Sequence, residues 1–271
     1  MGHGAFRFDG TLARKYRAHA MGSGPEVIVF SHGLGTDQTS WARLLESLPD
    51  RYTALLFDLP GAGPLLPDDF DSDNYRTLAP FADDVLALLE EVGVARCTFV
   101  GHSVSGMIGV LAAIEDPGRV ERLVLLNSSP RYLNDGDYVG GFEPQDLADL
   151  FEAMGSNYQA WVAGFAPLAI AAQAPDAVDS FSAGLLAMRP DVMIAISRSI
   201  FESDVRALLP ALAAPTVLIH SRSDIAVPEA VAHYTHRMIA GSRLVWIDAS
   251  GHLPHLSAPQ EVAGALWANL A

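Results

Sequence analysis

The chain has 271 residues, half of them hydrophobic, which is enough for one large α/β domain or two small ones with a sizeable core. Its 17 Lys and Arg residues against 32 Asp and Glu give a formal net charge of −15, so it should repel nucleic-acid phosphates and anionic membranes. A single cysteine, no visible signal peptide and no uninterrupted apolar run of about 20 residues predict a cytoplasmic protein of a reducing compartment.

Six apolar runs end in glycine-rich or polar turns and are predicted to be strands. They begin at Glu26, Tyr52, Cys97, Arg122, Thr216 and Arg243. Helical patterns alternate with them, over Trp41–Leu48, Leu78–Val92, Ser105–Glu115, Glu229–Ile239 and Pro259–Leu270. Runs that are apolar on both faces are typical of parallel strands covered by helices on each side. The alternation therefore predicts a doubly wound α/β fold, with ligands bound at the carboxyl ends of its strands.

The alternation breaks from about Arg131 to Phe201, where no strand is predicted. This stretch has several helical patterns, punctuated by Gly155, Pro167, Pro175 and Pro190. We therefore expect one α/β core formed by residues 1–130 and 204–271. Residues 131–203 are expected to be inserted into it as a helical cap, or lid, over the strand ends.

The most informative motif is GHSVSG at residues 101–106. An apolar strand that begins at Cys97 leads into Gly101, His102 and Ser103, and a helical pattern follows at once. This context predicts a nucleophile elbow, a sharp turn that exposes a serine hydroxyl. The usual pattern is G-x-S-x-G, and Ser105 at its fifth position is the next size up from glycine or alanine, so the motif is loosened. Cys97 is interpreted as a packing residue.

A serine hydroxyl is a weak nucleophile until a base and an orienting carboxylate activate it. Asp224 follows the strand that begins at Thr216, and His252 follows the last strand. The order serine, acid, histidine is the one that accompanies an elbow of this kind. We predict that Ser103 attacks a carbonyl, His252 takes its proton, and Asp224 fixes the tautomer of the imidazole.

Other histidines and aspartates near the motif are weaker candidates. His102 is predicted to point away from the elbow and to be structural, and His32 belongs to the HGLG turn at residues 32–35. His255 is expected to line an entrance or to be solvated. Asp248 is too close to His252 in sequence to reach the far nitrogen of its ring easily.

An oxyanion hole is predicted from two backbone N–H groups. One belongs to Val104, the residue after the nucleophile, and the other to Leu34 in the SHGLG turn. Neither a metal nor an organic cofactor is expected, because the histidines are scattered, no H-E-x-x-H occurs and cysteines do not cluster.

The motifs HGLGTDQTSW, VGHSVSGMIGVLAAI, SPRYLND, GGFE, NYQAWVAGFAPLA, MRPD and GHLPHLSAP resemble the α/β-hydrolase superfamily. Within it they are most similar to the branch of the bacterial stress regulator RsbQ and the plant strigolactone and karrikin receptors. The resemblance runs from about Gly22 to the C-terminus and includes the cap. It implies a triad of Ser103, His252 and Asp224 beneath a four-helix cap.

The resemblance also implies a small apolar pocket. By analogy its walls would draw on Leu34, Val104, Tyr158, Trp161, Phe165 and Phe201. The plant receptors usually have phenylalanine where this chain has Leu34, which implies a wider pocket floor.

Three functions are compatible with these residues. The first is a serine hydrolase (a carboxylesterase or lactonase) that cleaves a small, mostly apolar ester or lactone through an acyl-enzyme. The second is a sensor that slowly hydrolyses its ligand and signals through the cap to a protein partner, such as a PAS-domain phosphatase. The third is a C–C bond hydrolase, which uses the same triad.

Overall fold

The computed structural model describes residues 6–63, 70–171 and 173–270. Residues 1–5 and 64–69 of the predicted core, residue 172 of the predicted cap and residue 271 lie outside the described residues. Among the described helices, none is long and apolar enough to cross a lipid bilayer.

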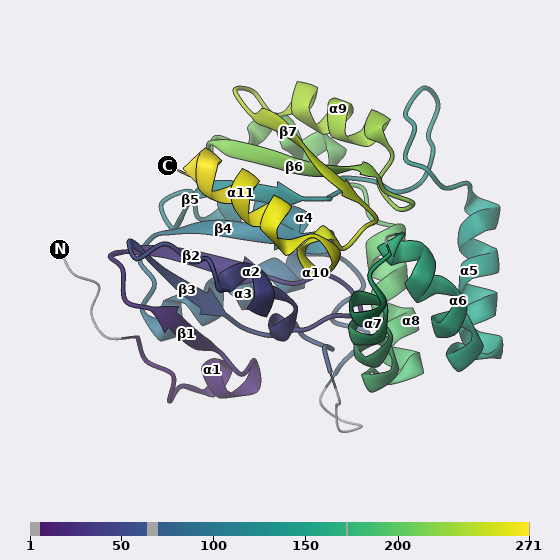
Figure 1. The fold of residues 1–271 in the computed structure, drawn as a ribbon, viewed down its shortest axis with the longest axis horizontal. Helices are drawn as coiled ribbons and strands as arrows, with labels where there is room; N and C mark the ends of the chain where they lie inside the picture. The colour runs from purple at the N-terminus through teal and green to yellow at the C-terminus, as the bar shows by residue number, and fades with distance from the viewer. Residues whose placement is uncertain (1–5, 64–69, 172, 271) are drawn as a thin grey trace.

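The described residues form a seven-stranded sheet in the order β1-β3-β2-β4-β5-β6-β7 (Figure 1). The strands are β1 (His19–Gly22), β2 (Glu26–Ser31), β3 (Tyr52–Leu56), β4 (Cys97–His102), β5 (Val120–Leu126), β6 (Thr216–Ser223) and β7 (Arg243–Ser250). All neighbouring pairs are parallel except β1 and β3. The six predicted strands are confirmed, and β1 is additional. It is a short, mostly exposed edge strand without the apolar pattern that marks the others.

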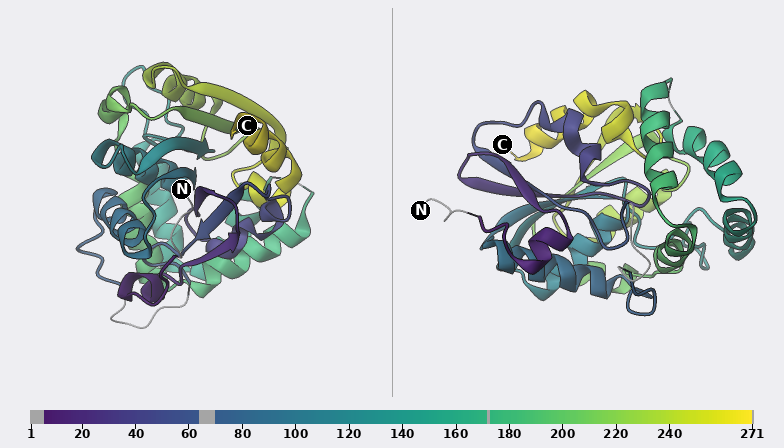
Figure 2. Two further views of the ribbon diagram at one scale, coloured as in Figure 1. Left: turned by 90° about the vertical axis from the view of Figure 1, so that its left-hand side faces the viewer. Right: turned by 90° about the horizontal axis from the view of Figure 1, so that it is seen from below.

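Side chains of the central strands alternate between two hydrophobic clusters, one on each face of the sheet. Val27 and Val29 of β2 enter one cluster, whereas Ile28 and Phe30 enter the other. Successive residues of a strand point to opposite faces, so a strand buried on both faces must be apolar throughout. Figure 2 shows the helices on both sides of the sheet. The predicted doubly wound α/β architecture is therefore confirmed.

One cluster includes residues of α1 (Thr11–Lys15), α3 (Ala79–Val92), α4 (Val104–Glu115) and α9 (Glu229–Met238), and the other includes residues of α2 (Ala42–Leu45) and α11 (Pro259–Leu270). Three short helices complete the core: η1 (Gln38–Trp41), η2 (Arg206–Ala211) and α10 (Pro254–Ser257). The helix predicted over Trp41–Leu48 is confirmed only over Ala42–Leu45, and its predicted bounds are wrong. A 3₁₀ turn, capped by the Asp37 carboxylate at the N–H of Thr39, precedes a very short α-helix.

Among the described residues, four α-helices precede η2 between β5 and β6 in the chain: α5 (Pro144–Ser156), α6 (Tyr158–Ile170), α7 (Pro175–Ala187) and α8 (Pro190–Phe201). They gather at one end of the sheet (Figure 1). The turn after β7 contacts them there, because the His252 N–H donates to the Ala169 carbonyl at the end of α6 at 2.7 Å. The helices thus cover the end of the sheet at which the parallel strands finish.

Candidate active site

Ser103 lies between the end of β4 and the start of α4. Its backbone has φ 55° and ψ −122°, a conformation that strains a non-glycine residue. The residue is buried, with only 5% of its surface exposed. A strained turn of this kind separates the serine hydroxyl from the backbone on either side, as the elbow motif predicts.

Ser105 at the fifth motif position does more than fit the space. Its hydroxyl donates to the carbonyl of His32 and accepts from Ser31 Oγ at 2.8 Å. All three residues are buried. These bonds tie the first turn of α4 to the end of β2, so the serine that departs from the usual pattern joins the elbow to the HGLG turn.

The structure brings Ser103, His252 and Asp224 together from three strand ends. His252 Nε2 lies 2.8 Å from Ser103 Oγ, and His252 Nδ1 lies 2.8 Å from Asp224 Oδ2. The Asp224 side chain is 2% exposed, and its Oδ1 accepts from the N–H groups of Ala226 at 2.8 Å and Val227 at 3.2 Å. One carboxylate oxygen is thus held by the backbone while the other faces the imidazole.

The backbone of His252 is fixed from both sides. Its N–H bonds to the end of α6, while its carbonyl lies 2.8 Å from His102 Nε2 and 3.3 Å from Asn127 Nδ2. Asn127 is fully buried after β5 with φ 46°, and its side chain also bonds to Ser221 of β6. Asn127 was not predicted as a site residue, although a polar residue directly after a buried strand is a usable signal.

The neighbouring histidines have structural positions. His102 supports the His252 carbonyl, as its predicted structural role requires. His255 is fully buried between Trp41, with ring centroids 4.6 Å apart, and His102, at 4.3 Å. Both predicted alternatives for His255, an entrance residue or a solvated one, are therefore wrong. Burial lowers the pKa of His255 to about 3. Asp248 is exposed on β7.

The two predicted oxyanion donors flank the elbow. Val104 is the first residue of α4, where the N–H groups have no partner within the helix and the helix dipole favours negative charge. Leu34 follows Gly33, and a Cβ added at Gly33 would lie 2.5 Å from His102 Nδ1 and 3.2 Å from Ser103 Cβ. Only glycine therefore lets this turn lie so close to the nucleophile. That the two N–H groups stabilise an oxyanion stays a prediction.

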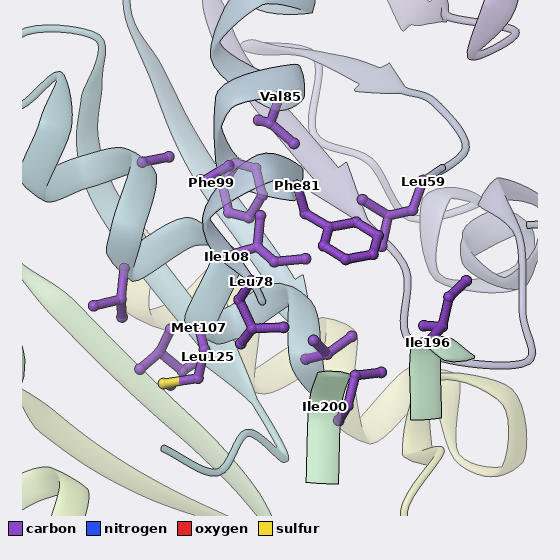
Figure 3. Close-up of a cluster of buried hydrophobic side chains, with 14 of the residues drawn as sticks. Leu59, Leu78, Phe81, Val85, Phe99, Met107, Ile108, Leu125, Ile196 and Ile200 are labelled. Atoms are coloured by element: carbon purple, nitrogen blue, oxygen red, sulfur yellow. The ribbon is translucent and has the colours of Figure 1, made fainter. Parts of the chain in front are cut away.

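An apolar cavity lies beside the HGLG turn, with about 340 Å³ of space not filled by atoms, part of it open to solvent. Leu34 and Val104 line it at the site. Its lining also includes Leu59, Phe81, Ile108, Ile196 and Ile200. Figure 3 shows these last five side chains gathered from the core and from α8. The lining therefore joins residues that flank the elbow to residues of α8.

The four predicted aromatic pocket residues are absent from the lining of this cavity. Tyr158, Trp161 and Phe165 follow one another along α6, with ring centroids 5.5 Å and 5.0 Å apart. The Tyr158 hydroxyl donates to the Leu185 carbonyl at 2.7 Å. Phe201 packs against Tyr132, 5.0 Å away. A ligand-binding role for these four residues stays a prediction.

Cys97 is buried, and burial raises the pKa of its thiol to about 12, which suits the predicted packing role and leaves little thiolate at neutral pH. Within the described ranges, no cluster of three or more His, Cys, Asp or Glu side chains has the arrangement of a metal site.

The fold and the elbow define a class of protein, and comparison with known proteins agrees. The model of the alpha/beta hydrolase family matches residues 28–265, so the chain belongs to that family.

Particular relatives lie in the plant branch that the sequence motifs indicated. A probable esterase from Oryza sativa subsp. japonica is 47% identical, over 95% of this chain and 96% of the relative. Karrikin insensitive 2 receptor CA from Petunia hybrida is 46% identical, over 95% of this chain and 96% of the relative. Among solved structures, a hydrolase from Oleispira antarctica aligns with a TM-score of 0.91 and 28% identity, over 96% of both chains. The predicted family and branch are therefore confirmed.

Proposed function

We propose that this protein is a serine hydrolase that cleaves a small, mostly apolar ester or lactone through an acyl-enzyme. The observation that carries the proposal is the unbroken hydrogen-bonded chain from Asp224 through His252 to Ser103, with both distances at 2.8 Å. The relatives named as esterases support the same class of reaction.

The proposed roles follow from the direction of the hydrogen bonds. Asp224 accepts the Nδ1 proton of His252, which leaves Nε2 free to accept the proton of Ser103 as Oγ attacks the carbonyl carbon. The Val104 and Leu34 N–H groups stabilise the oxyanion that forms, and the imidazolium returns its proton to the leaving group. Water then repeats the sequence on the acyl-enzyme.

The cavity supports the proposed substrate class. The lining side chains of Leu59, Phe81, Ile108, Ile196 and Ile200 are aliphatic or aromatic and carry no charge, so burial of a polar acyl chain against them would be unfavourable. Leu34 and Val104, which carry the proposed oxyanion donors, are among the residues that line the cavity.

We also propose residues 131–203 as the cap, with the core on either side. The two ends of this segment meet, because the Val205 N–H donates to the Pro130 carbonyl at 2.9 Å and Arg131 Nη1 lies 3.1 Å from Asp204 Oδ2. A segment that leaves and re-enters the core at one point is suited to move as a unit.

The test is mass spectrometry of the wild type and Ser103→Ala with a p-nitrophenyl ester and a butenolide lactone, in parallel with turnover. We expect an acyl adduct and turnover with the wild type and neither with the variant. Undiminished turnover by Ser103→Ala would overturn the proposal.

A sensor that signals through the cap is the second candidate. A relative named as a receptor covers almost the whole chain, and two large apolar side chains on cap helices are exposed, Leu168 by 63% and Leu186 by 50%. An adduct that persists after one turnover would favour the sensor, whereas an adduct that clears rapidly would favour the enzyme. A protein partner is then sought by pull-down with the wild type as bait. The Leu168→Glu variant is the control bait, because this change alters the exposed apolar surface and leaves the three proposed catalytic residues in place.

A further inference from the structure

Tyr132 lies directly beside the nucleophile, although neither the motif nor the proposed mechanism uses it. It follows β5 at the start of the proposed cap and is 2% exposed. Its ring packs edge-on against Phe201 and Phe142, with centroids 5.0 Å and 6.4 Å away. Within the described residues, the one hydrogen bond of its hydroxyl is to Ser103 Oγ, at 3.4 Å.

The direction of this bond follows from the other bonds of Ser103. The Ser103 hydroxyl donates its proton to His252 Nε2, so its oxygen has only lone pairs to offer Tyr132. Burial raises the pKa of the Tyr132 hydroxyl above its ordinary value, so the group keeps its proton at neutral and mildly alkaline pH. Tyr132 is therefore the donor, and Ser103 Oγ is the acceptor.

We propose that Tyr132 is a further catalytic residue, which stabilises Ser103 Oγ as it leaves the acyl-enzyme during deacylation. The inference rests on the proposed hydrolase function. A separation of 3.4 Å is long for a bond between two hydroxyls. Such contacts shorten once the acceptor carries charge, and hydrogen bonds to charged groups are stronger than those to neutral groups.

The step concerned is the second half of the reaction. Water attacks the acyl carbon while His252 Nε2 takes one of the water protons. The tetrahedral intermediate then collapses: the bond between carbon and Oγ breaks, its electron pair goes to Oγ, and His252 returns the proton there. Tyr132 keeps its own proton throughout and donates only a hydrogen bond to the developing charge on Oγ.

This hydrogen bond affects the two halves of the reaction unequally. Before acylation, Oγ is a hydroxyl oxygen that already accepts from Tyr132, so the bond stabilises the ground state as well as the transition state. Before deacylation, Oγ is the bridging oxygen of an ester, a weak acceptor, and the bond gains strength only as Oγ leaves. Only interactions that strengthen in the transition state accelerate a step.

Tyr132→Phe tests the inference, because it removes one oxygen and retains the ring between Phe142 and Phe201. Stopped-flow hydrolysis of p-nitrophenyl acetate gives acylation from the burst and deacylation from the slower phase. We expect deacylation to slow about tenfold, equivalent to about 1.4 kcal/mol, and acylation to change less than about threefold. Intact mass spectrometry should show a longer-lived acyl-enzyme in the variant.

The matched control is Tyr138→Phe. Tyr138 is a second buried tyrosine of the same segment, and its hydroxyl donates to the Arg131 carbonyl at 2.7 Å, away from Ser103. The inference is overturned if Tyr132→Phe deacylates at the wild-type rate, or if both variants slow equally in both phases. If the wild type itself forms no acyl adduct, the proposed function fails and this inference fails with it.

Discussion

The two carboxylate oxygens of Asp224 have separate partners. Oδ1 accepts from the backbone N–H groups of Ala226 and Val227, and Oδ2 accepts from His252. The backbone donors hold the carboxylate in one orientation, so the side chain cannot rotate to offer His252 a different contact. The tautomer of His252 therefore depends on one atom, Asp224 Oδ2, which must accept a hydrogen bond from Nδ1.

Asp224→Asn should abolish catalysis with little change in fold. The amide oxygen would stay with the two backbone donors, and the amide nitrogen would then donate to His252 Nδ1 and force the proton onto Nε2. That tautomer cannot accept the Ser103 proton, and kcat should fall by about 10⁴. Measurement of kcat with p-nitrophenyl acetate and of the thermal midpoint checks both expectations. Asp248→Asn, on the exposed face of β7, should leave kcat unchanged.

Sequence patterns were sufficient to predict some residues of the candidate site and insufficient for others. Ser103, Asp224 and His252 were recognisable because each follows an apolar strand, and such strand ends meet at one edge of a parallel sheet. Ser105 and Tyr132 were visible in the sequence, but their contacts are with residues far away along the chain. No local pattern specifies that Ser105 binds the end of β2 or that the Tyr132 hydroxyl reaches Ser103.

Among the elements, the end of α6 and the turn after β7 are in direct backbone contact. Gly251 in this turn has φ 90°, and a Cβ added to it would lie 2.0 Å from the Ile170 carbonyl oxygen. The next residue is His252, whose N–H bonds to Ala169. The end of α6 therefore holds the proposed catalytic base through the backbone, so a displacement of either element should displace the imidazole.

We therefore expect Gly251→Ala to lower kcat by more than its loss of folding stability can explain. The added methyl would push the turn away from α6, and a misplacement of about 1 Å at a catalytic group lowers the rate about 100-fold. The check is kcat together with the urea midpoint. Gly241→Ala is the matched control, because Gly241 also has positive φ, at 71°, but no atom lies within 4 Å of its added Cβ. Equal loss of kcat in the two variants would contradict the role of the contact.

Helices and strands with a clear apolar pattern were predicted from the sequence, and those without one were not. The strands β2 to β7 and the helices α3, α4, α9 and α11 were recognised because buried positions impose an apolar pattern on the sequence. The edge strand β1 has little burial to impose one, and it depends on pairing with β3. The predicted pocket aromatics of α6 are absent from the lining of the cavity for a related reason: an apolar side chain on α6 can pack against a neighbouring helix, as Phe165 of α6 does against Phe181 of α7.

At the scale of the whole molecule, several histidines are enclosed in the protein without the partners that a charged ring needs. His255 has no hydrogen-bond partner for either ring nitrogen among the described residues, and His102 and His220 each have one unpartnered nitrogen. Burial lowers the pKa of His102 well below its ordinary value and that of His220 to about 4. These rings are therefore neutral in the folded protein throughout mildly acidic pH.

The sign of the effect on stability follows from linkage. In the unfolded chain, these histidines bind protons below a pH of about 6.5, whereas in the folded protein they do so only near their lowered pKa values. The unfolded state thus binds more protons between these limits. Stability is fully present above a pH of about 6.5 and is lost as pH falls toward about 4, independently of the catalytic reaction.

His255→Phe should make the protein less sensitive to acid. The phenyl ring can keep the stacking on Trp41 but cannot be protonated on unfolding. The fall in unfolding free energy between pH 6.5 and 5 should therefore be smaller than in the wild type, by about 1 kcal/mol per pH unit. Urea unfolding at pH 7.5, 6 and 5 measures this slope. His19→Phe, which alters an exposed histidine on β1, should keep the wild-type slope, because that ring meets solvent in the folded and unfolded states alike. An unchanged slope in His255→Phe would mean that the buried ring is already protonated in the folded protein.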